Sequence, residues 1–411
     1  MGKRTVDIMA PVGSFESLRA AFQGGADAVY FGIEQLNMRA RSSINFTTDD
    51  LVEVVNLCHE HGVKAYLTLN TILYDHDINL MKKIVKTAYD SNVDAIIAMD
   101  QAAISYAHSL GMSVHISTQI NITNIEVVKF YANFANVMVL SRELTLQQVK
   151  SICDAVVKED VRGPNGELVQ IEVFVHGALC MAVSGKCYLS LHTANSSANR
   201  GACKQNCRRT YEVKDSEGNE LMIDNEYIMS PKDLCTVTFL DQIIETGVSV
   251  LKIEGRSKGP DYVKEVTSCY REAADAVAEG TFTHEKGKEW EERMDNVFNR
   301  GFWGGYFLGK ELGEWTDEDG SKAKKRKIYI GDGAKYFGKI GVGEFVLKNG
   351  ELALGDDIII TGPTTGIVEH TVSNLRLDEA DVDTVKRGDR FTFKIDQKIR
   401  PADKLYKIVD A

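Results

Sequence analysis

Half of the chain's eight cysteines lie in one short stretch, and their spacing is the strongest sign of chemistry in the sequence. They follow the pattern C-x6-C-x15-C-x3-C and are Cys180, Cys187, Cys203 and Cys207. Thiolates are the ligands that soft metals and iron–sulfur clusters select, and four of them close a coordination shell. The segment therefore predicts a bound metal or an iron–sulfur cluster. Cys235, in MSPKDLC, is a fifth candidate that could replace one of the four.

The spacing does not identify the metal, because it is neither that of a ferredoxin nor the paired C-x2-C of a zinc ribbon. Two simpler interpretations stay open. Disulfides are one, but the N-terminus MGKRTVDIMAP does not resemble a secretory signal and predicts a cytoplasmic, reducing environment. Buried thiols without a role are the other, and this interpretation suits the scattered Cys58, Cys153 and Cys269.

Length and composition restrict the class of protein. The 411 residues are 44% hydrophobic and 26% charged, which is typical of a globular protein with room for one large domain and one small one. No apolar run is long enough for a membrane-spanning helix, so no membrane partner is expected. The net charge of −11 argues against a wholly basic nucleic-acid-binding surface but allows local basic patches. Two such patches are present: Arg200, Lys204, Arg208 and Arg209, and Lys322, Lys324, Lys325, Arg326 and Lys327.

The first 260 residues alternate between short apolar runs and amphipathic helical patterns. The runs are apolar rather than alternating, as expected for parallel strands that are buried on both faces. Eight such units predict an α/β fold of the (β/α)8, or TIM-like, barrel type. An open doubly wound sheet is the alternative, but no G-x-G-x-x-G follows the first strand.

Polar residues follow the predicted strands, where the reactive groups of a barrel lie. Any one of them could simply cap the next helix, but several at one rim favour a catalytic site. We select as catalytic candidates Gln119, Asn121, Arg142, Glu143, His176, Lys252, Glu254 and Arg256. Because His176 comes four residues before Cys180, the cysteine segment is expected to cover the mouth of the barrel.

The character of the sequence changes near its C-terminal quarter. Helical patterns are expected over 261–280 and 286–309, and residues 313–327 read as a linker that changes from acidic to basic. Beyond them, short strands and glycine-containing turns predict a small antiparallel β-barrel. The predicted organisation is a barrel region over 1–312, a linker over 313–327 and an accessory domain over 328–411.

Several sequence blocks resemble those of the U32 family, which has long been catalogued as collagenase-like peptidases. The most specific is EVFVHGALCMAVSGKCYLS, and others are MAPVGSFESLRAAFQGGADAVYFG, STQINITN, MSPKDLC, LKIEGRSKGPDYVKEVTSCYR and NRGFWGGYFLG. The resemblance covers nearly the whole chain, including the predicted β-barrel.

The resemblance implies an activity on RNA. Similar members are implicated in making 5-hydroxyuridine at the tRNA wobble position with prephenate, and others modify ribosomal RNA or carry four-cysteine clusters. It implies a 4Fe-4S cluster on Cys180, Cys187 and Cys203, with the fourth ligand open between Cys207 and Cys235. The implied partners are tRNA and a small dicarboxylate, prephenate. Cationic candidates for binding its carboxylates are Arg39, Arg41, Arg142, Lys252 and Arg256.

Two other functions stay open. A U32 collagenase-like peptidase is one, although neither H-E-x-x-H nor G-x-S-x-G is present. A cysteine nucleophile paired with His176 is conceivable for such a peptidase. The other is a non-catalytic binding protein in which a metal only fixes the loop, since structural metal sites are usually closed by four ligands.

Overall fold

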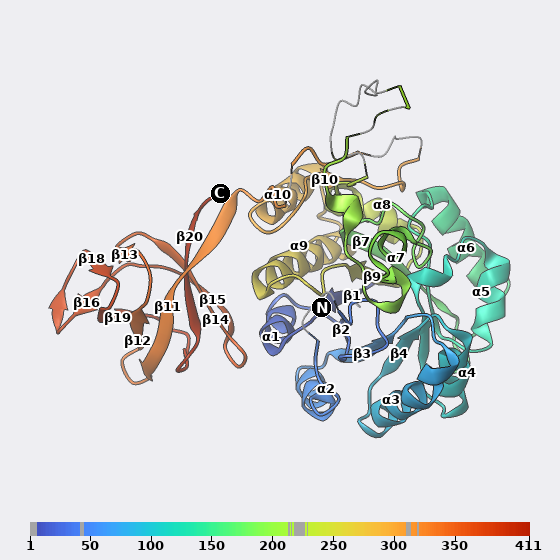
Figure 1. Ribbon diagram of the computed structural model, residues 1–411, viewed down its shortest axis with the longest axis horizontal. Coiled ribbons are helices and arrows are strands. Elements are labelled where there is room, and N and C mark those ends of the chain that lie inside the picture. Colours follow the sequence, from blue (N-terminus) through green and yellow to red (C-terminus); the bar gives the residue numbers. More distant parts are fainter. Residues whose placement is uncertain are drawn as a thin grey trace.

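The computed structural model describes residues 6–41, 45–212, 214, 216–217, 227, 229–309, 314–318 and 320–411. It has two parts, a barrel ringed by helices and a smaller domain of strands, which lie beside each other in Figure 1. The predicted boundary at residues 312 and 313 lies outside the described residues.

Eight parallel strands close into a barrel, which confirms the predicted fold. In chain order β1 to β7 each pair with the next strand, and β9 closes the ring by pairing with both β7 and β1. The strands are β1 (Asp7–Pro11), β2 (Ala28–Phe31), β3 (Lys64–Leu69), β4 (Ala95–Ala98), β5 (Val114–Ile116), β6 (Val137–Val139), β7 (Gln170–Gly177) and β9 (Val250–Ile253).

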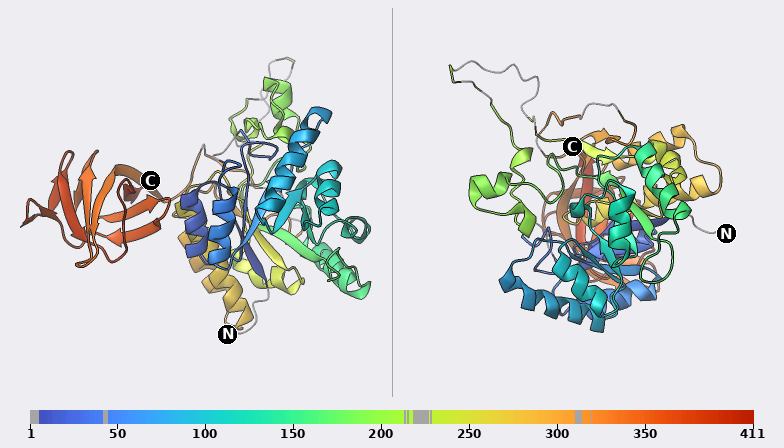
Figure 2. Two further views of the ribbon diagram at one scale, coloured as in Figure 1. Left: turned by 90° about the horizontal axis from the view of Figure 1, so that it is seen from below. Right: turned by 90° about the vertical axis from the view of Figure 1, so that its right-hand side faces the viewer.

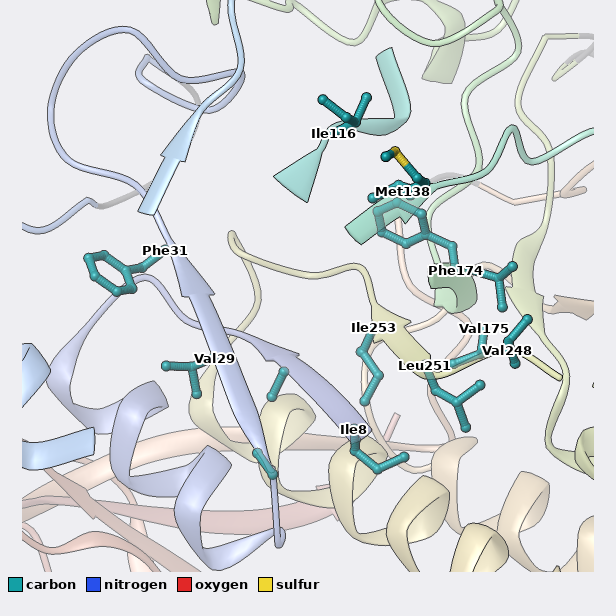
Figure 3. Packing of buried hydrophobic residues seen from close by; sticks show 14 of the residues in the cluster. Ile8, Val29, Phe31, Ile116, Met138, Phe174, Val175, Val248, Leu251 and Ile253 are labelled. Atoms are coloured by element: carbon teal, nitrogen blue, oxygen red, sulfur yellow. The ribbon is translucent and has the colours of Figure 1, made fainter. Parts of the chain in front are cut away.

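Helices cover the outside of the barrel because each presents an apolar face to the strands. Figure 3 shows side chains such as Val29, Leu251 and Ile253 in this layer, and all three are buried. Side-chain caps fix several helix starts, including Asp100, whose carboxylate accepts the amide proton of Ala102 at 3.0 Å. The helices are α1 (Phe15–Gln23), α2 (Leu51–Glu60), α3 (Ile78–Asp90), α4 (Gln101–Ser109), α5 (Ile125–Ala132), α6 (Leu146–Lys158), α8 (Leu240–Glu245), α9 (Pro260–Ala278) and α10 (His284–Met294).

The cysteine segment follows β7 directly. It contains the short helix α7 (Leu189–Ala194) and returns through β8 (Asp233–Cys235), which pairs antiparallel with the end of β7. Gly177 has φ of +102°, and a Cβ there would lie 2.6 Å from the Glu254 carbonyl oxygen. Glycine thus allows the close approach of β7 to the chain after β9. In Figure 2 the segment, in green, lies over one end of the barrel.

The helical expectation for 286–309 is wrong in its second half. Helix α10 ends at Met294, and the chain then forms turns and the two-residue strand β10 (Phe302–Trp303), which pairs with β8. Gly301, Gly305 and Gly309 have φ of +74°, +69° and +72°, a left-handed conformation that does not continue an α-helix, so this stretch stays irregular.

The C-terminal strands form an antiparallel domain around a separate apolar core, as predicted. Strand β11 begins at Lys325, so the last three residues of the predicted linker belong to a strand. The strands are β11 (Lys325–Phe337), β12 (Val342–Leu347), β13 (Glu351–Ala353), β14 (Asp357–Gly362), β15 (Gly366–Thr371), β16 (Arg376–Leu377), β17 (Ala380–Asp381), β18 (Thr384–Lys386), β19 (Arg390–Lys394) and β20 (Lys404–Asp410).

Polar contacts join this domain to α1 and α9. The Gln23 amide donates to the Ile367 carbonyl and accepts from the Ile367 amide, both at 3.0 Å. Lys264 of α9 pairs with Glu369 at 2.6 Å. The β domain is therefore held against the barrel on the side where α1 and α9 lie.

Ion pairs occupy part of the second basic patch. Lys322 pairs with Asp317 at 2.6 Å and Lys324 with Asp295 at 3.0 Å. Lys327 pairs with Asp261 at the start of α9. These lysines neutralise carboxylates of the chain itself, which reduces what they can contribute to binding phosphates.

In the described part of the chain, no helix has the length and apolar character needed to cross a membrane.

Candidate functional site

A cavity of about 660 Å³ opens at the carboxyl ends of the barrel strands, beneath the cysteine segment. Its floor comes from groups at or after the strand ends, which include Thr68 of β3, Asn70 just after it, Gln119 after β5 and Arg142 after β6. Its cover is formed largely by residues 178–189 and by the later cysteines. This is the end of a barrel where substrates bind, because loops from all the strands converge there.

The cavity is strongly cationic although the chain carries a net charge of −11. Among its described lining residues, Glu254 is the only carboxylate, whereas eight are Lys or Arg. The cations are Arg39, Arg142, Lys186, Arg208, Lys252, Arg256, Lys258 and Arg300. Such an excess in a concave, partly dry site favours an anionic ligand.

Arg39 and Glu254 form the ion pair that crosses the floor, with 2.7 Å between Nη2 and Oε1. Burial on its own would raise the pKa of the Glu254 carboxyl. The positive charges of Arg39, Arg142 and Lys258 outweigh it and lower this pKa from its ordinary value of 4.5 to about 2. Glu254 is therefore a carboxylate at neutral pH and balances part of the cationic floor.

Two further arginines reach the floor with different supports. Arg256 donates from Nη1 to the Asn37 side-chain oxygen at 3.0 Å and to the Thr68 hydroxyl at 2.8 Å. Arg142 donates to the Ala178 carbonyl at 2.8 Å, and its guanidinium lies 4.0 Å from the centre of the Phe174 ring. Burial lowers the pKa of Arg256 to about 10, so it keeps its charge at neutral pH.

Lys252 projects from β9 into the barrel and also lines the cavity. Its Nζ lies 2.7 Å from Oε1 of Glu172, a fully buried carboxylate on β7. The other oxygen of Glu172 lies 3.9 Å from Nδ1 of His115. Burial lowers the pKa of His115 to about 3, so this imidazole is neutral at neutral pH.

Four thiols line one side of the same cavity: Cys180, Cys187, Cys203 and Cys207. Burial raises the pKa of Cys207, Arg208 opposes the shift, and the other three thiols raise it further. All four thiols therefore belong to the wall of one cavity. In the described residues, no three His, Cys, Asp or Glu groups are placed to share a single metal ion. A cluster does not require this, since its cysteines bind different iron atoms.

Residues outside the thiol set hold the cysteine segment in place. Arg208 donates to the carbonyls of Leu179 and Pro231, both at 2.7 Å, and so ties the two ends of the segment together. Arg200 pairs with Asp77 at 2.7 Å. Asn121 donates to the Ser184 carbonyl at 2.8 Å, so it supports the cover without lining the cavity.

Besides Asn121, four of the predicted site residues are not part of the described cavity lining. Glu143 and Arg41 are exposed, and Arg41 contacts the segment through its backbone amide, which donates to the Gly201 carbonyl at 3.1 Å. Cys235 is buried on β8, and burial raises its pKa to about 12. His176 is buried among the rings of Tyr262, Tyr270 and Phe302.

The cavity also contains residues that the sequence reasoning did not select. Tyr30 lies on β2, and its hydroxyl donates to the Ile253 carbonyl at 2.8 Å. Lys258 follows Arg256 by two residues, so its place after a strand end was a usable signal. Arg300 follows α10, and no local pattern near it indicates a barrel mouth.

The fold and the cavity define a TIM-type barrel protein whose site lies at the carboxyl ends of its strands. The chain belongs to Peptidase family U32, which it matches over residues 13–317. It is 54% identical to a protein named collagenase from Porphyromonas gingivalis, over 99% of both chains. It is 30% identical to tRNA hydroxylation protein P1 of Bacillus subtilis, over 99% of this chain and 96% of that one. It is also 35% identical to the 23S rRNA 5-hydroxycytidine C2501 synthase of Escherichia coli, over 67% of this chain and 40% of that one.

Replacing Arg39 with Met should destabilise the protein in a pH-dependent way. The substitution leaves the buried Glu254 carboxylate without its closest partner. We therefore expect the free energy of unfolding at pH 7 to fall by about 3 kcal/mol. Because the pKa of Glu254 is lowered, the contribution of the pair is present above pH 4.5 and disappears as the pH falls toward 2. Denaturant unfolding at pH 7 and pH 3 measures both values.

Arg41→Met is the matched control, since this exposed arginine should change stability by less than about 0.5 kcal/mol. The double variant Arg39→Met/Glu254→Gln should recover part of the loss. An equal loss at both pH values would contradict the assignment of the ion pair.

Proposed function

We propose that this protein hydroxylates RNA, with C5 of the tRNA wobble uridine as the target and prephenate as co-substrate. The observation that carries the proposal is that four thiols and eight cations share one cavity at the mouth of the barrel. The thiols supply ligands for a 4Fe-4S cluster, and the cations supply sites for a small dicarboxylate and for RNA phosphates.

Within this proposal the cluster ligands are Cys180, Cys187, Cys203 and Cys207. Their support is that all four line the cavity, whereas Cys235 lies on β8 with the Tyr270 hydroxyl 3.9 Å from its sulfur. When bound, such a cluster supplies electron transfer, which an oxidative modification of a base requires. Arg208 would hold the chain near Cys180 and Cys207 in a fixed position, because it donates hydrogen bonds to carbonyls at both ends of the segment.

The cations divide into two groups by exposure. Arg142, Lys252 and Arg256 lie at the floor, where their donors suit the carboxylates of a small acid. Lys186 and Lys204 are exposed on the cysteine segment and are available to RNA phosphates. An unpaired anticodon base costs little to extrude from its neighbours, so a uridine can reach the opening between these groups.

A tRNA substrate is supported over ribosomal RNA by the extent of the resemblance. The tRNA hydroxylation relative aligns with nearly the whole chain, which includes the β domain, whereas the rRNA-modifying relative aligns with two thirds of it. The name of the collagenase relative keeps a peptidase as the second candidate. The position of His176 gives that candidate little support, because its ring is enclosed by aromatic side chains away from the cavity lining.

Anaerobically purified protein should contain about four iron and four sulfide per chain, with visible absorption typical of a cluster. Cys180→Ser, Cys187→Ser, Cys203→Ser and Cys207→Ser should each lower the iron content while the barrel stays folded. Cys235→Ser is the matched control and should retain the iron. Zinc, or unfolding of every cysteine variant, would instead favour the non-catalytic role in which the metal only fixes the loop.

A deletion strain should lack 5-hydroxyuridine-derived nucleosides in its tRNA, as measured by mass spectrometry of digested tRNA. The wild-type gene should restore them and Cys187→Ser should not, while ribosomal RNA nucleosides stay unchanged. Suppose instead that tRNA from the deletion strain is unaltered and that the purified protein, with its metal content measured, hydrolyses gelatin. This result would refute the hydroxylase proposal and establish a peptidase activity.

Removal of the two exposed lysines on the cysteine segment should weaken tRNA binding. Each lost phosphate contact lowers the slope of log affinity against log salt by about one. Lys186→Ala/Lys204→Ala should therefore reduce that slope by up to about two, measured by filter binding at several salt concentrations. Lys322→Ala/Lys324→Ala removes the same charge from lysines already paired with carboxylates and should have a smaller effect. The reverse order would place the tRNA on the second basic patch instead.

A further inference from the structure

The amine of Lys252 lies at the floor of the cavity in a setting that a purely structural ion pair does not need. The residue is only 4% exposed, yet it belongs to the cavity lining. Its Nζ lies 4.6 Å from the centre of the Tyr30 ring and 5.4 Å from that of Phe174. The amine therefore lies near two aromatic rings at the wall of the cavity.

Glu172, behind the amine, keeps unused hydrogen-bonding capacity. Its Oε1 lies 2.7 Å from Lys252 Nζ, but its buried Oε2 has no hydrogen-bond partner among the described residues. The nearby Nδ1 of His115 is likewise buried and without a partner in that part of the chain. Unsatisfied buried groups are rare and costly, and a catalytic role is one of the reasons for which they are kept. Glu172 is thus suited to take a proton from Lys252 and return it.

The two aromatic rings near the amine also contact two guanidinium groups. Arg142 lies 4.0 Å from the centre of the Phe174 ring, and Arg256 lies 6.0 Å from that of Tyr30. Nε of Arg142 is buried and lacks a hydrogen-bond partner in the described structure. A guanidinium with unused donors binds a carboxylate in two-point fashion. A carboxylate held there would place the adjacent carbon of the same ligand near the lysine.

We propose that Lys252 forms an imine with the carbonyl carbon of a 2-oxo acid whose carboxylate is bound by Arg142 and Arg256. Glu172 first removes a proton from the ammonium, and the neutral amine adds to the carbonyl carbon. The same proton then returns to the former carbonyl oxygen, which leaves as water once a second proton has moved to it from nitrogen. The product is a positively charged iminium, so no oxidant or reductant is needed.

The local electrostatics support this chemistry. Burial lowers the pKa of the Lys252 ammonium, the Glu172 carboxylate opposes the shift, and the charges of Arg256 and Arg142 lower the pKa further. Lysine is the cation whose pKa responds most readily to burial, which is why buried lysines serve as imine-forming nucleophiles. The proposal concerns the cavity described above but does not require the RNA reaction, so the two can fail separately.

Lys258 is the natural competitor of Lys252. It lines the same cavity, and burial lowers its pKa to about 8. Its ammonium lies 3.0 Å from the centre of the Phe298 ring, and its side chain is less buried than that of Lys252. If a lowered pKa alone made a lysine reactive, Lys258 would react. If the position beside the carboxylate-binding arginines is what matters, Lys252 reacts instead.

The test is reductive trapping on the full-length protein, purified anaerobically. Pyruvate or phenylpyruvate is added with sodium cyanoborohydride, which reduces an imine to a stable secondary amine, and the protein is digested and mapped by mass spectrometry. We expect one peptide, containing Lys252, to gain the mass of the acid less one oxygen atom. Lactate and phenyllactate have the carboxylate but no carbonyl and should give no adduct.

Four variants test whether the adduct depends on the position of Lys252 or only on the general reactivity of lysines. Lys252→Met should abolish the adduct, and Glu172→Gln should slow trapping at least about tenfold, because the proton acceptor is lost. Lys258→Met removes one cavity cation but should leave the adduct on the peptide that contains Lys252. Lys322→Met, which changes a lysine outside the cavity lining, should leave the yield within about twofold. If Lys252→Met does not fold, the site mapped in the wild-type protein decides the matter. An adduct on Lys258, adducts spread over surface lysines, or none on Lys252 would overturn the proposal.

Discussion

Strand β9 closes the barrel, and this closure fixes where the cysteine segment and the floor of the cavity lie. β9 pairs with β1 on one side and β7 on the other, although the cysteine segment and β8 separate β7 from β9 in the chain. The segment must leave the carboxyl end of β7, and the chain must return to the opposite end to begin β9. The inserted residues therefore cover the mouth, and the strand that closes the barrel brings Lys252 and Glu254 beneath them.

The same closure decides how buried charge is balanced. Lys252 on β9 meets Glu172 on β7, and Glu254 just after β9 meets Arg39 from the loop after β2. Each pair joins groups far apart in the sequence, and each charge would be costly to bury alone. The two carboxylates offset only part of the positive charge at the floor. The remainder is available to anionic ligands, although the molecule as a whole is acidic.

The family relationship and the structure bear on different questions. Relatives of this chain are named for collagen cleavage and for RNA hydroxylation, so family membership alone does not choose between peptide and RNA as substrate. The arrangement of side chains is more selective. Four thiols face a cationic cavity, while His176, which comes four residues before Cys180, is enclosed by aromatic rings. His192 of the cysteine segment does line the cavity. This arrangement suits a bound cluster and an anionic substrate better than a cysteine–histidine pair.

The barrel, the antiparallel β domain and the group of four cysteines could be predicted from the sequence, because apolar periodicity, turn residues and close thiol spacing are local signals. The sequence also placed Gln119, Arg142, Lys252, Glu254 and Arg256 at strand ends, which converge in any such barrel. The sequence could not predict that His176 and Cys235 lie in the packing around β8, that part of the basic run is paired with acids, or that Arg300 reaches the cavity. These outcomes depend on which distant residues share a dry environment, and no local pattern encodes that.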